Sequence, residues 1–213
     1  MSVSSDRIQP LKLEKLKKVE LFFIDLENIT SQEAEDAKQF LDQESLNKCL
    51  RYVNKEDQQK SLITHAFLHH LLSKKVGIAP SRISLKRTSY GKPYLEGFPI
   101  HFNLSHTKHA ALIAFHSSPI GVDIEAIDPS RVLQKTPTIN PSEQEVIDQS
   151  EDPVDTFFSY WCAKEALLKA KGTGLSCKNY PYLEFSSHST CHYMNDTIHL
   201  LNKANAKLAV CLI

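Results

Sequence analysis

Two short segments of the chain combine acidic and basic residues at spacings that could hold a metal ion and phosphate together. In the segment GVDIE, Asp123 and Glu125 are two residues apart within an apolar run, so both side chains leave the same face if the segment is a strand. In the segment WCAKEALLK, Glu165 and Lys169 are four residues apart and share one face of a helix. Paired carboxylates suit a hard divalent cation, and lysines suit phosphate oxygens. With Lys164 included, three carboxylates and two lysines are expected to hold one metal-bound pyrophosphate.

Each segment also has a purely structural interpretation. A D-x-E pair on a strand is often an exposed polar face, and Glu165 and Lys169 could be a surface pair worth only about 0.2–0.5 kcal/mol. The neighbouring residues favour a site. Val122 and Ile124 would be buried on the opposite strand face, which leaves the two carboxylates projecting together. Trp161 belongs to the apolar stripe of the helix, so Glu165 lies at its buried edge, where a carboxylate needs a partner.

Other candidate sites are weaker. His65 and His69 have an i, i+4 spacing that metal ligands can use, but they lack the glutamate of an H-E-x-x-H motif and an evident third ligand. Zinc is therefore not favoured. Gly172 and Gly174 follow a predicted helix, whereas loops that cradle phosphate precede one, so the glycines are interpreted as a helix C-cap.

The elements that position these residues follow from apolar periodicity and capping residues. Helices are expected from Ser31, as N-cap, toward Leu41; from Asn54, in a capping box with Asp57, to Gly77; and from Asp152 to Gly172. Strands are expected at residues 19–26, 83–87, 100–104, 110–115, 120–125, 183–185, 198–201 and 208–213.

The order of these elements predicts two similar halves. A strand, a long helix and a small, mostly antiparallel sheet occur twice, and the best candidate for the join is the stretch 116–120. The predicted fold class is therefore α+β, with each half formed by a sheet packed with a long helix. We place the halves at residues 1–117 and 118–213.

Composition limits the classes of partner. Lysine plus arginine equals aspartate plus glutamate, at 25 each, so no global basic field favours binding to nucleic acid. No apolar run has the length of a signal peptide core or a membrane span, which predicts a protein that is neither secreted nor membrane-bound. Five scattered cysteines without regular spacing favour a reduced, cytoplasmic setting: Cys49, Cys162, Cys177, Cys191 and Cys211.

Five motifs follow one another along the chain: NKED (54–57), GKPY (91–94), FNLSH (102–106), GVDIE (121–125) and W-x-x-K-E-A-x-x-K (161–169). On these motifs the sequence resembles the 4′-phosphopantetheinyl transferases of the surfactin-synthetase-activating type over most of its length. The resemblance implies a pseudo-dimer of two similar α+β halves with the active site in the cleft between them. It also implies magnesium-dependent transfer of the phosphopantetheine arm of coenzyme A to a serine of an apo acyl or peptidyl carrier protein, with release of 3′,5′-ADP.

Matching positions carry over the roles of the metal and catalytic residues. By this resemblance Asp123, Glu125 and Glu165 would be ligands of Mg²⁺, with Mn²⁺ as a possible substitute. Lys169 would neutralise charge on the departing phosphate. The general base would be Glu165, Glu143 or a metal-bound water.

By the same resemblance, other residues would hold the nucleotide end of coenzyme A. The candidates that would hold it are Lys92, Ser105 and His106, with Lys48 and Lys60 as weaker candidates for the 3′-phosphate and Lys164 either assisting or facing solvent. The chain departs from the family pattern at Ser45, where a basic residue is common three positions before Lys48. This departure leaves the strength of 3′-phosphate binding open.

Two other functions remain as alternatives: a coenzyme A-binding protein without turnover, and a metal-dependent phosphohydrolase that uses the same carboxylates with water. The carrier protein and its pathway are not marked in the sequence. Because two halves in one chain can supply the whole cleft, we expect a monomer.

Overall fold

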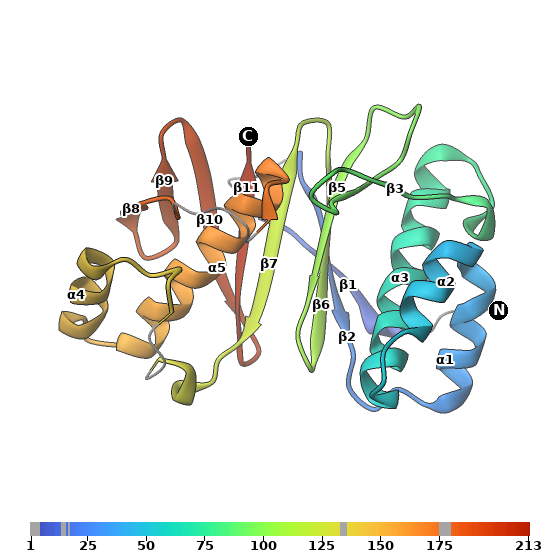
Figure 1. Cartoon of the computed structure of the whole chain (residues 1–213), viewed down its shortest axis with the longest axis horizontal. Helices are drawn as coiled ribbons and strands as arrows, with labels where there is room; N and C mark the ends of the chain where they lie inside the picture. Colours follow the sequence, from blue (N-terminus) through green and yellow to red (C-terminus); the bar gives the residue numbers. More distant parts are fainter. Residues whose placement is uncertain (1–4, 14–15, 17, 133–135, 175–179) are drawn as a thin grey trace.

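Two antiparallel sheets lie side by side in the computed structural model, and helices cover their outer sides (Figure 1). The structure describes residues 5–13, 16, 18–132, 136–174 and 180–213. Antiparallel sheets packed with helices confirm the predicted mixed α and β class. Among the helices of the described residues, none is long and apolar enough to span a bilayer.

The first sheet has four antiparallel strands. In order across the sheet these are β1 (Ile8–Leu11), β2 (Glu20–Asp25), β6 (Ala110–His116) and β5 (His101–His106). Its outer face packs against α1 (Ser31–Ala37), α2 (Gln43–Leu50) and the long helix α3 (Lys55–Val76). A two-stranded ribbon of β3 (Lys86–Arg87) and β4 (Pro93–Tyr94) completes this half.

The second sheet has five antiparallel strands. In order these are β7 (Ile120–Ala126), β11 (Ala206–Leu212), β10 (Asp196–Lys203), β9 (Thr190–Tyr193) and β8 (Glu184–Ser187). The long helix α5 (Pro153–Lys171) packs on β7 and β11, and the shorter α4 (Pro141–Gln149) packs beside α5. Each half thus pairs one sheet with one long helix.

Capping residues fix the ends of the long helices at the predicted positions, but among the described residues the Asn54 amide forms no bond to the Asp57 side chain, which the predicted capping box requires. The Asn54 side chain accepts hydrogen bonds from the first-turn amides of α3, and Gly77 ends that helix with a φ of 71°. The Asp152 side chain accepts from the amide of Asp155, and Gly172 ends α5 with a φ of 69°. A positive φ strains residues that carry a Cβ, so glycine suits both ends.

The predicted start of α1 is wrong by one residue. Thr30, and not Ser31, is the N-cap: its hydroxyl accepts from the amide of Glu33, whose carboxylate accepts from the amide of Thr30. This reciprocal capping box requires the acid three residues after the cap, and only Thr30 has that spacing to Glu33.

The predicted strand at 83–87 is also too long. Only Lys86–Arg87 pairs, because Ile83 and Leu85 turn into the core of the first half after a short 3₁₀ helix at Pro80–Arg82. The strands β1 and β9 and the helices α2 and α4 were not predicted, since each is short. Among the described cysteines, all four are buried and free, and Cys177 lies outside the described residues.

The two faces of β7 make different contacts. Ile120, Val122 and Ile124 pack into an apolar layer between the two sheets, as expected from the period of a strand. The intervening residues face α5, and the helix comes so close that a Cβ on Gly121 would lie 2.0 Å from the carbonyl oxygen of Ala166. This close approach sets the position of the helix that carries Glu165 and Lys169.

We therefore expect Gly121→Ala to destabilise the protein. The added methyl group would meet backbone atoms of α5, which cannot move as a flexible side chain could. The loss in free energy of unfolding should reach the upper end of the range for overpacked cores, about 1–3 kcal/mol, or exceed it. Urea denaturation followed by circular dichroism would measure it.

The matched control is Gly77→Asn, which places a new Cβ in open space and in a conformation that asparagine tolerates. It should cost less than about 1 kcal/mol. Equal losses for the two variants would contradict the packing argument.

Candidate active site

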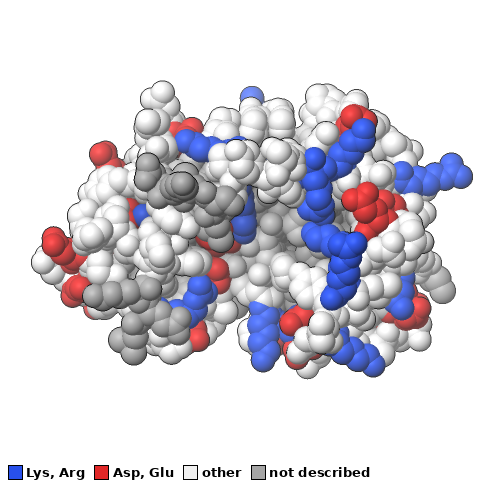
Figure 2. Space-filling model, viewed as in Figure 1, with Lys and Arg blue, Asp and Glu red and all other residues white. Residues whose placement is uncertain are grey.

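A cavity of about 530 Å³ opens between the two halves. On the face shown in Figure 2 it corresponds to the central hollow, beside a band of Lys and Arg side chains on the first half. Eight of the residues predicted to form the site line it: Lys48, Lys92, Ser105, His106, Asp123, Glu125, Glu165 and Lys169. The structure therefore brings residues from four of the five motifs, together with Lys48, to one place.

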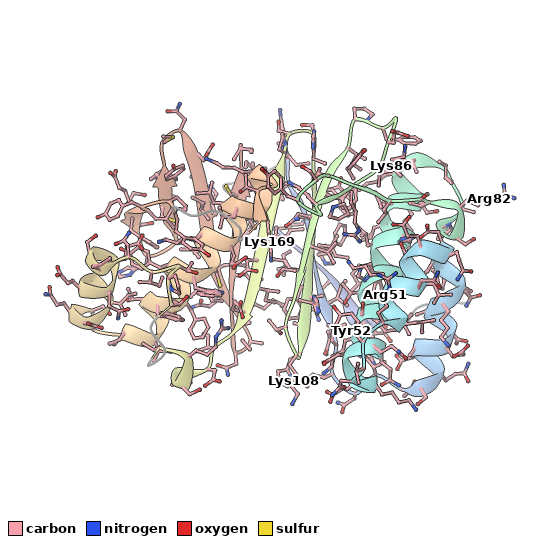
Figure 3. All side chains as sticks on the ribbon, in the orientation of Figure 1. Arg51, Tyr52, Arg82, Lys86, Lys108 and Lys169 are labelled. Carbon is pink, nitrogen blue, oxygen red and sulfur yellow. The ribbon has the colours of Figure 1, made fainter. Side chains whose placement is uncertain are left out.

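The strand β7 and the helix α5 present the acidic residues and one lysine. Asp123 and Glu125 share the face of β7 that meets α5, while Glu165 and Lys169 follow each other by one helical turn. The Nζ of Lys169 lies 2.7 Å from Oδ1 of Asp123. Figure 3 shows Lys169 beside β7 at the centre of the molecule.

The strand β5 of the first half reaches the same carboxylate. The hydroxyl of Ser105 donates to Oδ1 of Asp123 at 2.8 Å and accepts from Lys169 at 2.9 Å. Two residues earlier, Oδ1 of Asn103 accepts from the amide of Val122 at 2.8 Å. These contacts join the two halves at the cavity, so Ser105 acts here on the acidic side of the site.

Two side chains donate hydrogen bonds to Glu125, one from inside the motifs and one from outside them. The indole Nε1 of Trp161 donates to one carboxylate oxygen, and Arg131 donates to the other, both at 2.8 Å. The Arg131 guanidinium also lies 4.9 Å from the centre of the Trp161 ring. Trp161 therefore positions Glu125 as well as packing in the apolar stripe.

Burial and crowding change the charge states of the acidic cluster. Loss of hydration, with repulsion from Asp123, raises the pKa of Glu165 to about 7. The same two causes raise the pKa of Glu125, although Arg131 opposes the shift. Burial disfavours the charge on Lys169, but attraction and a hydrogen bond to Asp123, together with attraction to Glu165 and Glu125, raise the pKa of the lysine overall. Lys169 and Arg131 therefore offset the negative charge of the cluster only in part.

The donor set suits a hard cation. Oδ2 of Asp123 is buried and has no hydrogen-bond partner among the described residues, which leaves one carboxylate oxygen free to ligate. Within the same residues, no three His, Cys, Asp or Glu side chains are gathered tightly enough to hold a metal by themselves. A cation here would need oxygen ligands from a substrate as well.

The opposite end of the cavity is cationic. Lys48 lies on α2, and burial, with repulsion from Arg87, lowers its pKa. His106 remains accessible at the end of β5, and desolvation together with Lys169 and Lys48 lowers its pKa. Lys92 lines the cavity, but its Nζ donates to the carbonyl oxygens of Ile120 at 3.1 Å and Ala170 at 2.8 Å. In this arrangement Lys92 binds the backbone of the second half.

The remaining three predicted residues do not line the cavity. Lys60 forms an ion pair with Glu56 of its own helix. Lys164 and Glu143 are fully buried and form an ion pair with each other. The expectation that Lys164 could face solvent is therefore wrong, and Glu143 has no path to a substrate hydroxyl in this arrangement.

The Glu143–Lys164 pair has a structural role. Lys164 also donates to the carbonyl of Thr138 at 2.7 Å, and the Glu143 carboxylate accepts from the amides of Asn140 at 3.0 Å and Leu183 at 3.3 Å. One buried pair thus ties α4, the preceding loop and the segment before β8 to α5.

Comparisons with known proteins agree with this geometry. A family model described as 4′-phosphopantetheinyl transferase, N-terminal, matches residues 28–118, and one described as 4′-phosphopantetheinyl transferase superfamily matches residues 119–211. The chain is 31% identical to 4′-phosphopantetheinyl transferase Sfp of Bacillus subtilis (strain 168), in an alignment that covers 70% of this chain and 67% of the relative. The chain belongs to the 4′-phosphopantetheinyl transferase superfamily.

Other relatives place it within the same enzyme class. A further Bacillus subtilis 4′-phosphopantetheinyl transferase is 35% identical, over 62% of this chain and 61% of that protein. HetI of a Nostoc species is 30% identical, over 74% of this chain and 70% of that protein. The alignments thus span about three fifths to seven tenths of these relatives. The predicted family is confirmed, and the relatives named ffp and Sfp support the surfactin-synthetase-activating type.

The predicted site residues do not include three basic residues of this region: Arg87 and His65, which line the cavity, and Arg131, which donates to Glu125. Arg131 and Arg87 lie outside the motifs, in short segments whose approach to the site depends on how the chain turns. His65 was considered only as a zinc ligand, whereas it lines the cavity with Nδ1 2.9 Å from the carbonyl oxygen of Ser61. Residues 60–69 of α3 are all buried, so amphipathic periodicity does not mark His65 as a site residue.

We expect Glu143→Ala to lower stability by about 3–5 kcal/mol, because the fully buried Lys164 would lose its counter-charge. Guanidinium denaturation would measure the loss. The double variant Glu143→Leu, Lys164→Met should recover part of it, since the unpaired charge is then gone. A single variant as stable as the wild type would contradict the structural role.

Proposed function

We propose that the protein transfers the 4′-phosphopantetheine arm of coenzyme A to a serine hydroxyl of an apo acyl or peptidyl carrier protein and releases 3′,5′-ADP. The observation that carries the proposal is one cavity in which an acidic cluster from the second half faces a cationic end from the first. The names of the relatives support the same transfer.

In this reaction the serine oxygen forms a bond to the phosphorus that carries the pantetheine arm, and the bond from that phosphorus to the bridging oxygen breaks. The leaving 3′,5′-ADP takes the bridging oxygen and its electron pair. Lys169, already charged and hydrogen-bonded to Asp123, lies where it can offset negative charge on the departing phosphate.

We assign magnesium, with manganese as a substitute, to Asp123, Glu125 and Glu165. When bound, such a cation supplies Lewis-acid stabilisation and orientation of phosphate oxygens. The free Oδ2 of Asp123 and the raised pKa values of Glu125 and Glu165, which follow from burial and from Asp123, support this assignment.

Glu165 is the candidate general base that lines the cavity. Its carboxylate lies in the cavity, where a serine hydroxyl could reach it, whereas Glu143 is fully buried in its ion pair with Lys164. We therefore assign it the proton of the serine hydroxyl, in place of Glu143.

We also propose that the halves, residues 1–117 and 118–213, form a pseudo-dimer whose cleft is the active site, so that a monomer suffices. Lys48, His106 and Lys92 would serve the nucleotide end. We place the reaction in the cytoplasm, with coenzyme A and the carrier protein as partners and without a role for nucleic acid or membrane.

Glu165→Ala should lower the rate of transfer by at least about 10²-fold, because it removes both a candidate ligand and the candidate base. Intact mass spectrometry of an apo carrier protein, incubated with coenzyme A and magnesium, would measure the rate. The control is Glu145→Ala, since Glu145 is exposed on α4 and does not line the cavity.

Full transfer by Glu165→Ala would contradict the site. Hydrolysis of coenzyme A by the wild type without a carrier would instead indicate a phosphohydrolase, and calorimetric binding of coenzyme A without release of 3′,5′-ADP would indicate a binding protein.

Removal of divalent cations with EDTA should abolish transfer by the wild type, because three crowded carboxylates would then repel the pyrophosphate. The same mass assay would show recovery when magnesium or manganese is added in excess. Undiminished transfer after exhaustive chelation would rule out the metal assignment.

A further inference from the structure

Three side chains, Glu125, Trp161 and Arg131, form a closed group of contacts at the acidic end of the cavity. Trp161 on α5 donates to Oε1 of the Glu125 carboxylate and Arg131 donates to Oε2, both at 2.8 Å. The Arg131 guanidinium lies 4.9 Å from the centre of the Trp161 ring. Each of the three side chains therefore contacts the other two.

Arg131 is the member of this group that does not line the cavity. It ends the 3₁₀ helix Pro129–Arg131, which follows β7, and its side chain is 33% exposed. Glu125 and Trp161 both line the cavity. Because Arg131 reaches the carboxylate from outside the cavity, its contacts extend to a bound ligand only through Glu125.

Aromatic rings of α5 restrict the orientation of the Arg131 guanidinium. Its central carbon lies 5.6 Å from the centre of the Phe158 ring, in addition to its contact with Trp161. Phe157 stacks on Trp161, with ring centres 6.1 Å apart and ring planes inclined by 22°. A planar guanidinium stacks on such rings, whereas an ammonium group does not. A guanidinium held in this way donates in a fixed direction, so the carboxylate that accepts from it is also fixed.

Arg131 is also the basic residue that pairs with Glu125 among the described residues. Lys207 lies opposite Glu125 on the neighbouring strand β11 and is buried. Its Nζ instead lies 2.6 Å from Oδ1 of Asp155, in the first turn of α5. The position of Glu125 therefore depends on Arg131 and not on the lysine beside it in the sheet.

The two hydrogen bonds leave Glu125 able to ligate a cation. A carboxylate has about four lone-pair sites on its two oxygens, and each oxygen of Glu125 uses one of them for Trp161 or Arg131. The two donors hold the plane of the carboxylate, so the remaining sites keep one direction. Side chains that orient a metal-ligating carboxylate typically contribute about 10–100-fold to metal affinity.

We infer that Arg131 is a positioning residue that holds Glu125 in the orientation in which it binds a divalent cation. The inference rests on the proposed function for the cation itself. The charge of Arg131 acts in the opposite direction, because a guanidinium repels a nearby divalent cation. The two effects predict changes of opposite sign in metal affinity, so removal of Arg131 distinguishes them.

The decisive substitution is Arg131→Met, which removes the donor and the charge but keeps an apolar side chain against the rings of α5. Binding of Mn²⁺ in the presence of coenzyme A, without a carrier protein, would be followed by loss of the electron paramagnetic resonance signal of the free ion. The dissociation constant for Mn²⁺ should rise about tenfold or more, because Glu125 loses its orientation. Arg131→Lys, which keeps a charged donor, should recover part of the loss.

Lys171 provides a matched control. Its Nζ pairs with Asp196 at 3.1 Å and lies 4.4 Å from the centre of the Tyr193 ring, and its side chain is 31% exposed, close to the value for Arg131. It therefore makes the same kinds of contact as Arg131, but it does not line the cavity and does not pair with Glu125. Lys171→Met should keep the wild-type affinity for Mn²⁺.

A second variant protects the test against a change in the fold. Arg131→Gln also removes the charge and should weaken Mn²⁺ binding in the same direction, and circular dichroism would check that both variants are folded. An unchanged Mn²⁺ affinity in both variants would give Arg131 a purely structural role and overturn the inference. A tighter affinity would overturn it as well, since the charge effect would then dominate.

The outcomes separate this inference from the proposed function. Unchanged or tighter Mn²⁺ binding by the Arg131 variants would leave the transferase proposal standing. Weaker binding would support the inference even if no transfer to a carrier protein occurred. A wild type that binds no Mn²⁺ with coenzyme A would contradict the metal assignment of the proposed function, and the inference with it.

Discussion

The hydrogen-bonded contact of Ser105, Asp123 and Lys169 is the interaction on which the site depends. Its members come from β5, β7 and α5, so one set of bonds fixes the separation of the two sheets and the rotation of the helix. Asp123 is only 2% exposed, and a carboxylate so deeply buried needs donors of this kind. The positions of β5, β7 and α5 around the cavity therefore follow from the hydrogen bonds that satisfy the charge of Asp123.

The two ends of the cavity each hold charge that the protein does not offset by itself. At one end, burial and Asp123 raise the pKa of Glu165 to about 7, and at the other, burial and Arg87 lower the pKa of Lys48. Both pKa shifts show that the charged forms of Glu165 and Lys48 are disfavoured, and a ligand of opposite charge would stabilise them. A ligand that brings a cation to the first end and a phosphate to the second would complete both, as the proposed function requires.

Local periodicity accounts for what could be predicted from the sequence. The shared face of Asp123 and Glu125 follows from the period of a strand, and α5 could be bounded because its cap and its final glycine are close in sequence to the residues they serve. Contacts between distant segments could not be predicted in this way. Arg87 reaches the site through the turn of a short ribbon, and Glu143 meets Lys164 across 21 positions of chain.

The apolar layer between the sheets has a consequence for how the chain unfolds. Leu112 and Ala114 of β6 pack there against Val122 of β7 and Val210 of β11, and Lys92 of the first half caps the end of α5 in the second. Separating the halves would expose this whole layer to water and leave helix-end carbonyls unpaired. We therefore expect the two halves to unfold in one cooperative transition, in which the cavity between them is lost together with the apolar layer that joins them.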